Sequence, residues 1–159
     1  MTQASPPARV LFICRGNLCR SPMAMALFRH LLEGRPGCRA VADSAGYYDW
    51  APFPREAHPF ARRTVARLTG TDSLADHTAK AWTPELVEWA TRIVVAEEWM
   101  RADFPAEKAV TLRWLAGQTG DVSDPYGHDL RTHYECGREI LRLLEAGLHT
   151  LLRESADGG

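Results

Sequence analysis

The chain lacks a long hydrophobic run: none of its windows holds the roughly 18 uninterrupted apolar residues of a membrane-spanning helix. It also lacks an excess of one charge, because its formal net charge is −1 at pH 7. Nothing global therefore favours a nucleic acid or a membrane surface as a partner. Internal repeats and low-complexity segments are missing as well, which excludes a repeat architecture.

The chain contains only four cysteines, and no export signal is visible. The first seven residues lack the basic region and apolar core that are typical of a secretory signal. We therefore expect a cytoplasmic protein, in which thiols stay reduced and are reactive or buried rather than paired in a disulfide framework. The four cysteines are Cys14, Cys19, Cys38 and Cys136.

The length of 159 residues, with 45% hydrophobic and 25% charged residues, predicts one globular domain with a sizeable core. We place this domain at residues 9–153, between a disordered lead-in at residues 1–8 and a disordered tail at residues 154–159. Short apolar runs alternate with longer helical patterns, which favours a doubly wound α/β fold with a parallel sheet. The predicted strands are residues 9–14, 40–44, 93–95 and 109–112, and the predicted helices are residues 21–33, 60–68, 84–90 and 130–153.

The segment from Cys14 to Pro22 joins the first predicted strand to the first predicted helix, and it is the most informative part of the chain. A turn at this place points backbone N–H groups inward, and the helix presents its positive end to a bound oxyanion. The same field favours the thiolate form of Cys14, which makes it a nucleophile. Arg20 offers a planar guanidinium that matches two phosphate oxygens and stabilises the transition state.

The other residues of this loop have supporting roles. Gly16 lets the backbone approach the anion, and Asn17 tolerates a left-handed backbone and hydrogen-bonds across the turn. Ser21 can donate to the Cys14 sulfur and so stabilise it both as the attacking thiolate and as the leaving group. The predicted phosphate-binding loop also contains Arg15, Leu18 and Cys19.

The pattern Cys-x-Gly-Asn-x-Cys-Arg-Ser-Pro, which begins at Cys14, resembles the signature of the low-molecular-weight protein tyrosine phosphatases. Asp124-Pro125-Tyr126 is similar to the second signature of that family, and the resemblance covers nearly the whole chain. It implies a single domain with a four-stranded parallel sheet flanked by helices, and neither metal nor cofactor. It also implies hydrolysis of phosphotyrosine and small aryl phosphates through a cysteinyl-phosphate intermediate.

Asp124 has a chemical case of its own. A phenolate is a poor leaving group and needs a proton, which a carboxylic acid on a loop supplies. The same group, now a carboxylate, then activates water against the phosphoenzyme. Resemblance to the family further implies that Trp50 and Tyr126 form the aromatic walls of a slot for a flat ring.

Two cysteines raise the questions of redox chemistry and metal binding. Cys19 matches the second loop cysteine of the family, and we expect it to trap a Cys14 sulfenic acid as a disulfide and so prevent irreversible oxidation. His133 and Cys136 are three residues apart on a predicted helix, but two ligands do not make a metal site, and we expect no metal.

The chain departs from the family pattern in three places. Phe53 replaces a glycine of the variable loop, and His58 begins a His-Pro-Phe-Ala element in place of Asp-Pro-Arg-Ala. Arg15 stands where an apolar residue is more usual. Arg15 is then either a rim residue that favours acidic or doubly phosphorylated partners, or a solvated surface residue.

Three other functions compete with tyrosine phosphatase activity. A related protein-arginine phosphatase shares the loop but resembles a version with threonine in place of Leu18. An arsenate reductase needs a closely spaced cysteine pair, which Cys38 and Cys136 do not resemble. A catalytically silent anion-binding module does not require the intact nucleophile, arginine and acid. We expect a phosphotyrosine protein, such as a tyrosine kinase or its substrate, as the partner, and phosphate or other oxyanions as inhibitors.

Overall fold

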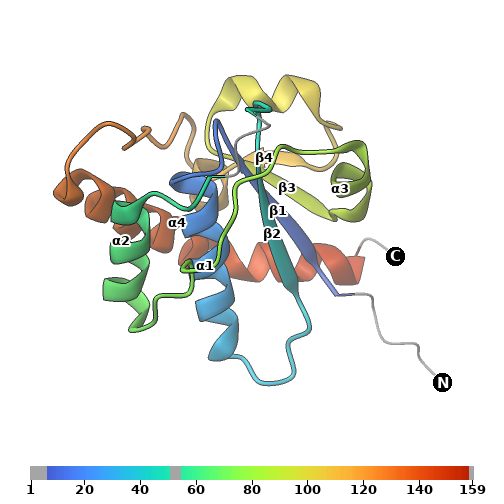
Figure 1. The fold of residues 1–159 in the computed structure, drawn as a ribbon. Coiled ribbons are helices and arrows are strands. Elements are labelled where there is room, and N and C mark those ends of the chain that lie inside the picture. Colours follow the sequence, from blue (N-terminus) through green and yellow to red (C-terminus); the bar gives the residue numbers. More distant parts are fainter. Residues whose placement is uncertain (1–6, 51–54, 158–159) are drawn as a thin grey trace.

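The computed structural model describes residues 7–50 and 55–157, with side chains up to residue 152. Figure 1 shows a central sheet with helices on both faces. The strands are β1 (Arg9–Cys14), β2 (Val41–Gly46), β3 (Arg92–Val95) and β4 (Ala109–Thr111). The α-helices are α1 (Arg20–Glu33), α2 (Pro59–Thr69), α3 (Pro84–Trp89) and α4 (Leu130–Asp157), and the 3₁₀-helices are η1 (Glu98–Asp103) and η2 (Arg113–Ala116).

All four strands are parallel, in the spatial order β2-β1-β3-β4. The chain goes from β1 to one side of the sheet and then returns to the other side, so the strand order reverses next to β1. Ligands of doubly wound sheets bind at such a switch point, beyond the carboxyl ends of the strands. Cys14 is the last residue of β1 and pairs with Gly46. The predicted doubly wound parallel sheet is confirmed.

Alternate residues of β1 pack on opposite faces of the sheet, as the pleat requires. Val10 and Phe12 belong to the larger core cluster with α1, α2 and α4, whereas Leu11 and Ile13 belong to the smaller one beside α3 and η1. Both faces are therefore covered, which explains why the central strands β1 and β3 are continuous apolar runs after their first residue rather than alternating ones. The rings of Phe12 and Phe28 meet edge to face at 5.8 Å and join β1 to α1.

Local signals set most helix ends within one residue of the predicted positions. Thr83 accepts a hydrogen bond from the Leu86 N–H and caps α3, and Gly70, with φ of 84°, ends α2 in the left-handed conformation. Two predicted ends were too early. The second strand continues to Gly46, because it stays paired with β1 along its whole length, and α4 continues to Asp157. Part of the predicted tail is therefore helical.

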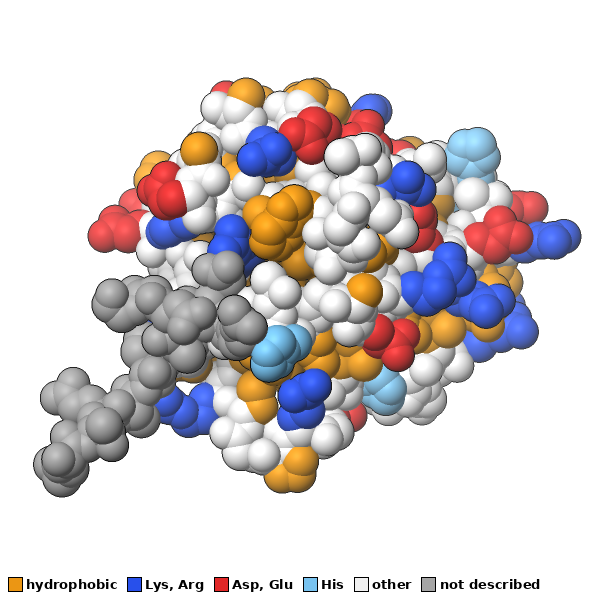
Figure 2. All heavy atoms as spheres, turned by 180° about the vertical axis from the view of Figure 1, so that it is seen from behind, with side chains coloured by type: hydrophobic (Ala, Val, Ile, Leu, Met, Phe, Trp, Pro, Cys, Tyr) orange, Lys and Arg blue, Asp and Glu red, His pale blue; other side chains and the backbone are white. Residues whose placement is uncertain are grey.

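The surface carries both signs of charge. On the face that Figure 2 shows, acidic and basic side chains are interspersed, with no large patch of one sign. Within the part of the chain that the structure describes, no helix is both long and apolar enough to cross a membrane.

Candidate active site

The loop between β1 and α1 is held from inside by Asn17. This residue has φ of 59°, the left-handed region that asparagine tolerates better than most residues. Its buried Nδ2 donates to the hydroxyls of Ser21, at 2.8 Å, and Ser44, at 2.9 Å. Its Oδ1 accepts from the Lys80 N–H at 3.1 Å. One side chain thus fixes the loop to α1, to β2 and to the segment that precedes α3.

The Cys14 sulfur lies 3.0 Å from the Ser21 hydroxyl, and both residues are buried. Because Asn17 donates to this hydroxyl oxygen, the hydroxyl proton has two acceptors left, the sulfur at 3.0 Å and the Ala45 carbonyl at 3.4 Å. The sulfur is the nearer one, and a thiolate in that position accepts a charge-assisted hydrogen bond. Ser21 is therefore placed to stabilise negative charge on Cys14.

A cavity of about 320 Å³ opens above the loop. It brings together residues that the sequence separates by more than a hundred positions. A Cβ atom on Gly16 would come within 2.1 Å of Cζ3 of Trp50, so the absence of a side chain lets the indole lie against the loop. The cavity is lined by Cys14, Arg15, Gly16, Leu18, Cys19, Arg20, Tyr48, Trp50, Arg55, Asp124 and Tyr126.

The two aromatic walls anticipated from the sequence, Trp50 and Tyr126, both line this cavity and are about half exposed. Tyr48 stacks on Trp50 with ring centroids 5.8 Å apart. Arg55 links the walls, because its guanidinium lies 5.8 Å from the Trp50 ring centre and donates to the Tyr126 hydroxyl at 3.4 Å. Arg55 was not predicted from the sequence as a site residue. It follows a segment outside the described residues that contains Phe53.

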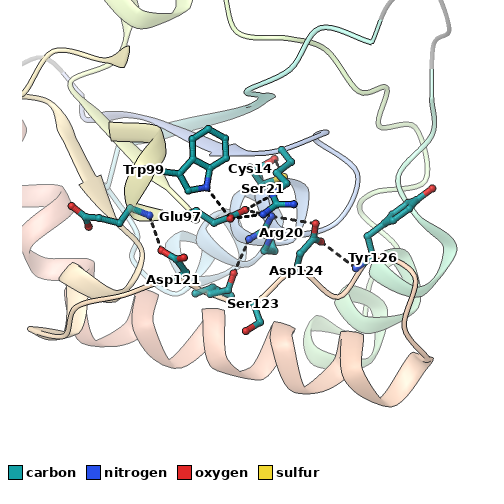
Figure 3. A network of polar contacts seen from close by, with 12 residues as sticks. Cys14, Arg20, Ser21, Glu97, Trp99, Asp121, Ser123, Asp124 and Tyr126 are labelled. Atoms are coloured by element: carbon teal, nitrogen blue, oxygen red, sulfur yellow. Dashed lines mark hydrogen bonds and ion pairs between the residues drawn. The ribbon is translucent and has the colours of Figure 1, made fainter. Parts of the chain in front are cut away.

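Arg20 is the most deeply buried charged residue of the site, with 1% of its surface exposed. Its Nη1 donates to the Val122 carbonyl at 2.7 Å, and its Nη2 donates to Glu97 at 2.8 Å (Figure 3). Nη2 also lies 3.4 Å from the Asp124 carboxylate. Among the described residues, Nε of Arg20 has no hydrogen-bond partner. Arg20 thus keeps one buried N–H donor without a partner among these residues.

Glu97 organises both arginines of the loop. Its two carboxylate oxygens accept a bidentate pair of hydrogen bonds from Arg15, each 2.8 Å long, and one more from Trp99 at 2.9 Å. Burial opposes the charge on Glu97, but the hydrogen bonds from Arg15, Trp99 and Arg20 outweigh it and lower the pKa to about 2. The hydrogen bond to Glu97 also raises the pKa of Arg15. Glu97 was not predicted from the sequence as a site residue, although its position just beyond β3, at the ligand-binding edge of the sheet, is a signal for one.

Asp124 is brought to the cavity by a loop that is fixed at both sides. Upstream, Asp121 accepts from the Glu98 N–H at 2.7 Å, and Asp124 itself accepts from the Tyr126 N–H at 3.1 Å. The second oxygen of Asp124 points toward Arg20 (Figure 3). The side chain keeps 32% of its surface exposed, so it is in contact with solvent.

Comparison with known proteins matches residues 9–157 to the family model of the low molecular weight phosphotyrosine protein phosphatases. The chain belongs to this family. A low molecular weight protein-tyrosine-phosphatase of Streptomyces coelicolor is 34% identical over 166 residues, which cover 94% of this chain and 96% of that one. A protein-arginine-phosphatase of Geobacillus stearothermophilus is 32% identical over 145 residues, covering 87% and 91%.

Solved structures of family members have the same fold. A low molecular weight protein tyrosine phosphatase from T. tengcongensis matches with a TM-score of 0.81 and 31% identity, over 90% of this chain and 99% of that one. An arginine phosphatase from Geobacillus stearothermophilus matches with a TM-score of 0.78 and 29% identity, over 96% and 98%. Membership of the family makes this protein a phosphoric monoester hydrolase, which acts on phosphoproteins.

Two further cysteines of this phosphatase, Cys19 and Cys136, are buried near the site. Cys19 lines the same cavity as Cys14, and its sulfur is 3.5 Å from Nε2 of His133. Burial raises the pKa of the Cys19 thiol, and it raises the pKa of the Cys136 thiol to about 12. The Cys136 sulfur contacts the Ser123 carbonyl at 3.9 Å. The sequence places two possible metal ligands, His133 and Cys136, three residues apart on the last helix. In the structure His133 contacts Cys19, whereas Cys136 contacts the Ser123 carbonyl.

Proposed function

We propose that this phosphatase hydrolyses phosphotyrosine in proteins through a phosphoryl group carried on Cys14. The observation that carries the proposal is the position of Cys14 in a cavity that also contains Arg20 and Asp124, with its sulfur 3.0 Å from the Ser21 hydroxyl. Transfer of a phosphoryl group first to a side chain and then to water needs a nucleophile, a cation and a carboxyl group.

In the first step, the Cys14 thiolate attacks phosphorus and the bond from phosphorus to the tyrosine oxygen breaks. Protonated Asp124 gives its proton to that oxygen, so tyrosine leaves as a neutral phenol. The N–H groups of the loop and the free Nε of Arg20 hold the phosphoryl oxygens, where preorganised donors stabilise the transition state.

In the second step, a water molecule attacks phosphorus while the Asp124 carboxylate removes its proton. The bond between sulfur and phosphorus breaks, phosphate leaves, and Cys14 returns as a thiolate. Ser21 stabilises this leaving group through the same short contact that stabilises the attacking form. The cycle closes with Asp124 protonated again.

The walls of the cavity favour an aromatic substrate. Trp50 and Tyr126 offer large, partly exposed faces on which a phenyl ring can stack. Hydrolysis of phosphoarginine is the second candidate, because two relatives that are 32% identical are named protein-arginine-phosphatases. Leu18, an apolar lining residue, favours the aryl ester over this alternative. The proposed partners are therefore phosphotyrosine proteins, such as a tyrosine kinase or its substrate.

A rate comparison tests this proposal. We expect kcat/KM on a phosphotyrosine peptide to exceed that on the matched phosphoarginine and phosphoserine peptides by at least tenfold. Cys14→Ser is the control, and it should abolish hydrolysis of all three. Faster hydrolysis of phosphoarginine would assign the protein to the second candidate, and hydrolysis that survives Cys14→Ser would refute the covalent mechanism.

We also propose that Cys19 protects Cys14 during oxidation. A peroxide converts the Cys14 thiolate to a sulfenic acid, and the Cys19 thiol then displaces water to form a disulfide, which a reducing thiol reopens. The two sulfurs line one cavity. After peroxide treatment, wild type should recover its activity on addition of thiol, whereas Cys19→Ser should recover much less. Full recovery of the variant would refute this role.

A further inference from the structure

Three side chains with metal-binding atoms meet behind the phosphate-binding loop. The sulfur of Cys19 and one imidazole nitrogen each of His58 and His133 all lie within 4.8 Å of one another. Cys19 immediately precedes α1, His58 immediately precedes α2, and His133 lies in the first turn of α4. These three helices pack together on one face of the sheet, so the cluster is anchored in the larger core.

We propose that Cys19, His58 and His133 form a binding site for a divalent transition-metal ion of the zinc type. When the ion binds, the Cys19 thiol releases its proton to solvent and coordinates as a thiolate. One thiolate and two imidazoles are ligands that such an ion prefers, and catalytic zinc sites use three protein ligands of this kind with an open fourth position. In a tetrahedral site with a Zn–S bond of about 2.3 Å and a Zn–N bond of about 2.0 Å, the sulfur and nitrogen lie about 3.5 Å apart. The Cys19 sulfur is 3.5 Å from Nε2 of His133.

The partners of His133 fix the nitrogen that a metal would use. Its Nδ1 lies 2.9 Å from the Asp129 carbonyl oxygen, which only an N–H can approach as a hydrogen bond. The lone pair of the neutral ring is therefore on Nε2, which faces Cys19. A histidine that donates its other N–H to a backbone carbonyl is the usual arrangement at metal sites. His133 and Cys19 are 0% and 3% exposed, so their positions are already set by packing.

His58 is the third and weakest ligand. Its ring stacks on that of His133 with centroids 4.6 Å apart, and its Nδ1 accepts from the Phe60 N–H at 3.0 Å. Binding through Nδ1 replaces this hydrogen bond, and binding through Nε2 requires a proton on Nδ1, which also removes it. Coordination by His58 therefore costs the side-chain cap of α2, and we expect its removal to weaken binding less than removal of Cys19 or His133.

A metal ion at this place would occupy the Cys19 sulfur. Cys19 would then be unable to trap an oxidised Cys14, so metal binding would compete with disulfide formation. This consequence rests on the proposed function, whereas the metal site itself does not. The test of the metal site must therefore measure metal coordination rather than phosphatase activity.

Cobalt(II) is the probe, added to the reduced full-length protein after removal of metals by a chelator. A tetrahedral site with one thiolate gives intense visible bands and a sulfur-to-cobalt charge-transfer band, which Zn²⁺ should abolish by displacement. We expect one ion per chain. Cys19→Ser should remove the charge-transfer band, His133→Gln should weaken binding at least tenfold, and His58→Gln should weaken it less.

Two matched variants control for the other thiols. Cys136→Ser removes a buried thiol of α4 that contacts the Ser123 carbonyl, and Cys14→Ser removes the nucleophile. Both should keep the cobalt spectrum. A spectrum that survives Cys19→Ser, that disappears with Cys14→Ser, or that never forms would overturn the proposal.

A measurement on wild type alone guards against variants that fail to fold. Zn²⁺ should slow alkylation of Cys19 by iodoacetamide at least tenfold, as peptide mapping by mass spectrometry would show, and it should leave alkylation of Cys38 unchanged. Equal alkylation of Cys19 with and without Zn²⁺ would refute the site.

Discussion

At the scale of a single residue, the contact of Arg15 with Glu97 distinguishes between two possible roles of Arg15. The sequence left it open whether Arg15 attracts acidic substrates or is simply solvated. In the structure its side chain is about half exposed, and both of its hydrogen bonds go to Glu97, which also holds Arg20. Its guanidinium is thus held by Glu97, and we infer that Arg15 orients Glu97 rather than recruiting acidic partners.

This inference predicts the behaviour of Arg15→Leu. The variant should lower kcat/KM on acidic and on neutral phosphotyrosine peptides by similar factors, because loss of Arg15 loosens Glu97 and hence Arg20 in every complex. The measurement is the ratio of the two kcat/KM values, which should change less than threefold. A loss confined to the acidic peptide would instead assign Arg15 to substrate recruitment.

Asp124 gives a second prediction at this scale. Asp124→Asn should lower turnover of phenyl phosphate by roughly two orders of magnitude, the usual size of general acid catalysis, because the amide has no proton to give to the leaving oxygen. Turnover of a dinitrophenyl phosphate, whose leaving group needs no proton, should fall much less in the step that releases the phenol. The rate constant of its burst phase in rapid-mixing experiments reports that step. Equal losses on both esters would argue that Asp124 only positions Arg20.

At the scale of elements, the phosphate-binding loop depends on one strained and fully buried residue. Asn17 combines φ of 59° with hydrogen bonds to Ser21, Ser44 and the Lys80 N–H. Asn17→Ala should lower the free energy of unfolding by roughly 3 kcal/mol, because buried partners lose their bonds and alanine is disfavoured in the left-handed region. It should also lower kcat, since the Ser21 hydroxyl loses its donor.

Asn17→Gly separates the two contributions. Glycine adopts the left-handed backbone freely but makes no side-chain bonds, so this variant should be about 1 kcal/mol more stable than Asn17→Ala while its kcat falls equally. Urea unfolding and steady-state kinetics measure the two quantities. Identical stabilities of the two variants would mean that the backbone of the loop is not strained by alanine.

At the scale of the whole molecule, local patterns predicted most of what the structure contains. The run from Arg9 to Cys14 and the helical spacing after Pro22 depend on short-range signals, and both elements form where the sequence indicates. Glu97 and Arg55 were not predicted as site residues, because their roles depend on contacts with residues that are about 70 to 80 positions away. The length of α4 was also underestimated: no glycine or proline interrupts the chain between Arg153 and Asp157, and the helix continues to Asp157.

The same long-range contacts make the stability of the whole fold depend on pH. The pKa of Glu97 in the folded protein is about 2, below its ordinary value of 4.5, because hydrogen bonds from Arg15, Trp99 and Arg20 outweigh the opposing effect of burial. The folded state therefore holds this proton less tightly than the unfolded state. The stabilisation of the folded state by ionised Glu97 is complete above pH 4.5 and is lost as the pH falls toward 2.

Glu97→Gln removes this stabilisation and leaves Arg20 buried without its carboxylate. At pH 7 the variant should be less stable than wild type by roughly 2 kcal/mol. The difference should shrink as the pH falls below 4.5, because Glu97 of unfolded wild type then takes up a proton that the folded protein does not bind until the pH nears 2. Urea unfolding at pH 7, 5, 4 and 3 measures it, and Glu145→Gln, which removes an exposed carboxylate of α4, is the control. A difference that stays constant down to pH 3 would show that Glu97 stabilises the fold by its shape and not by its charge.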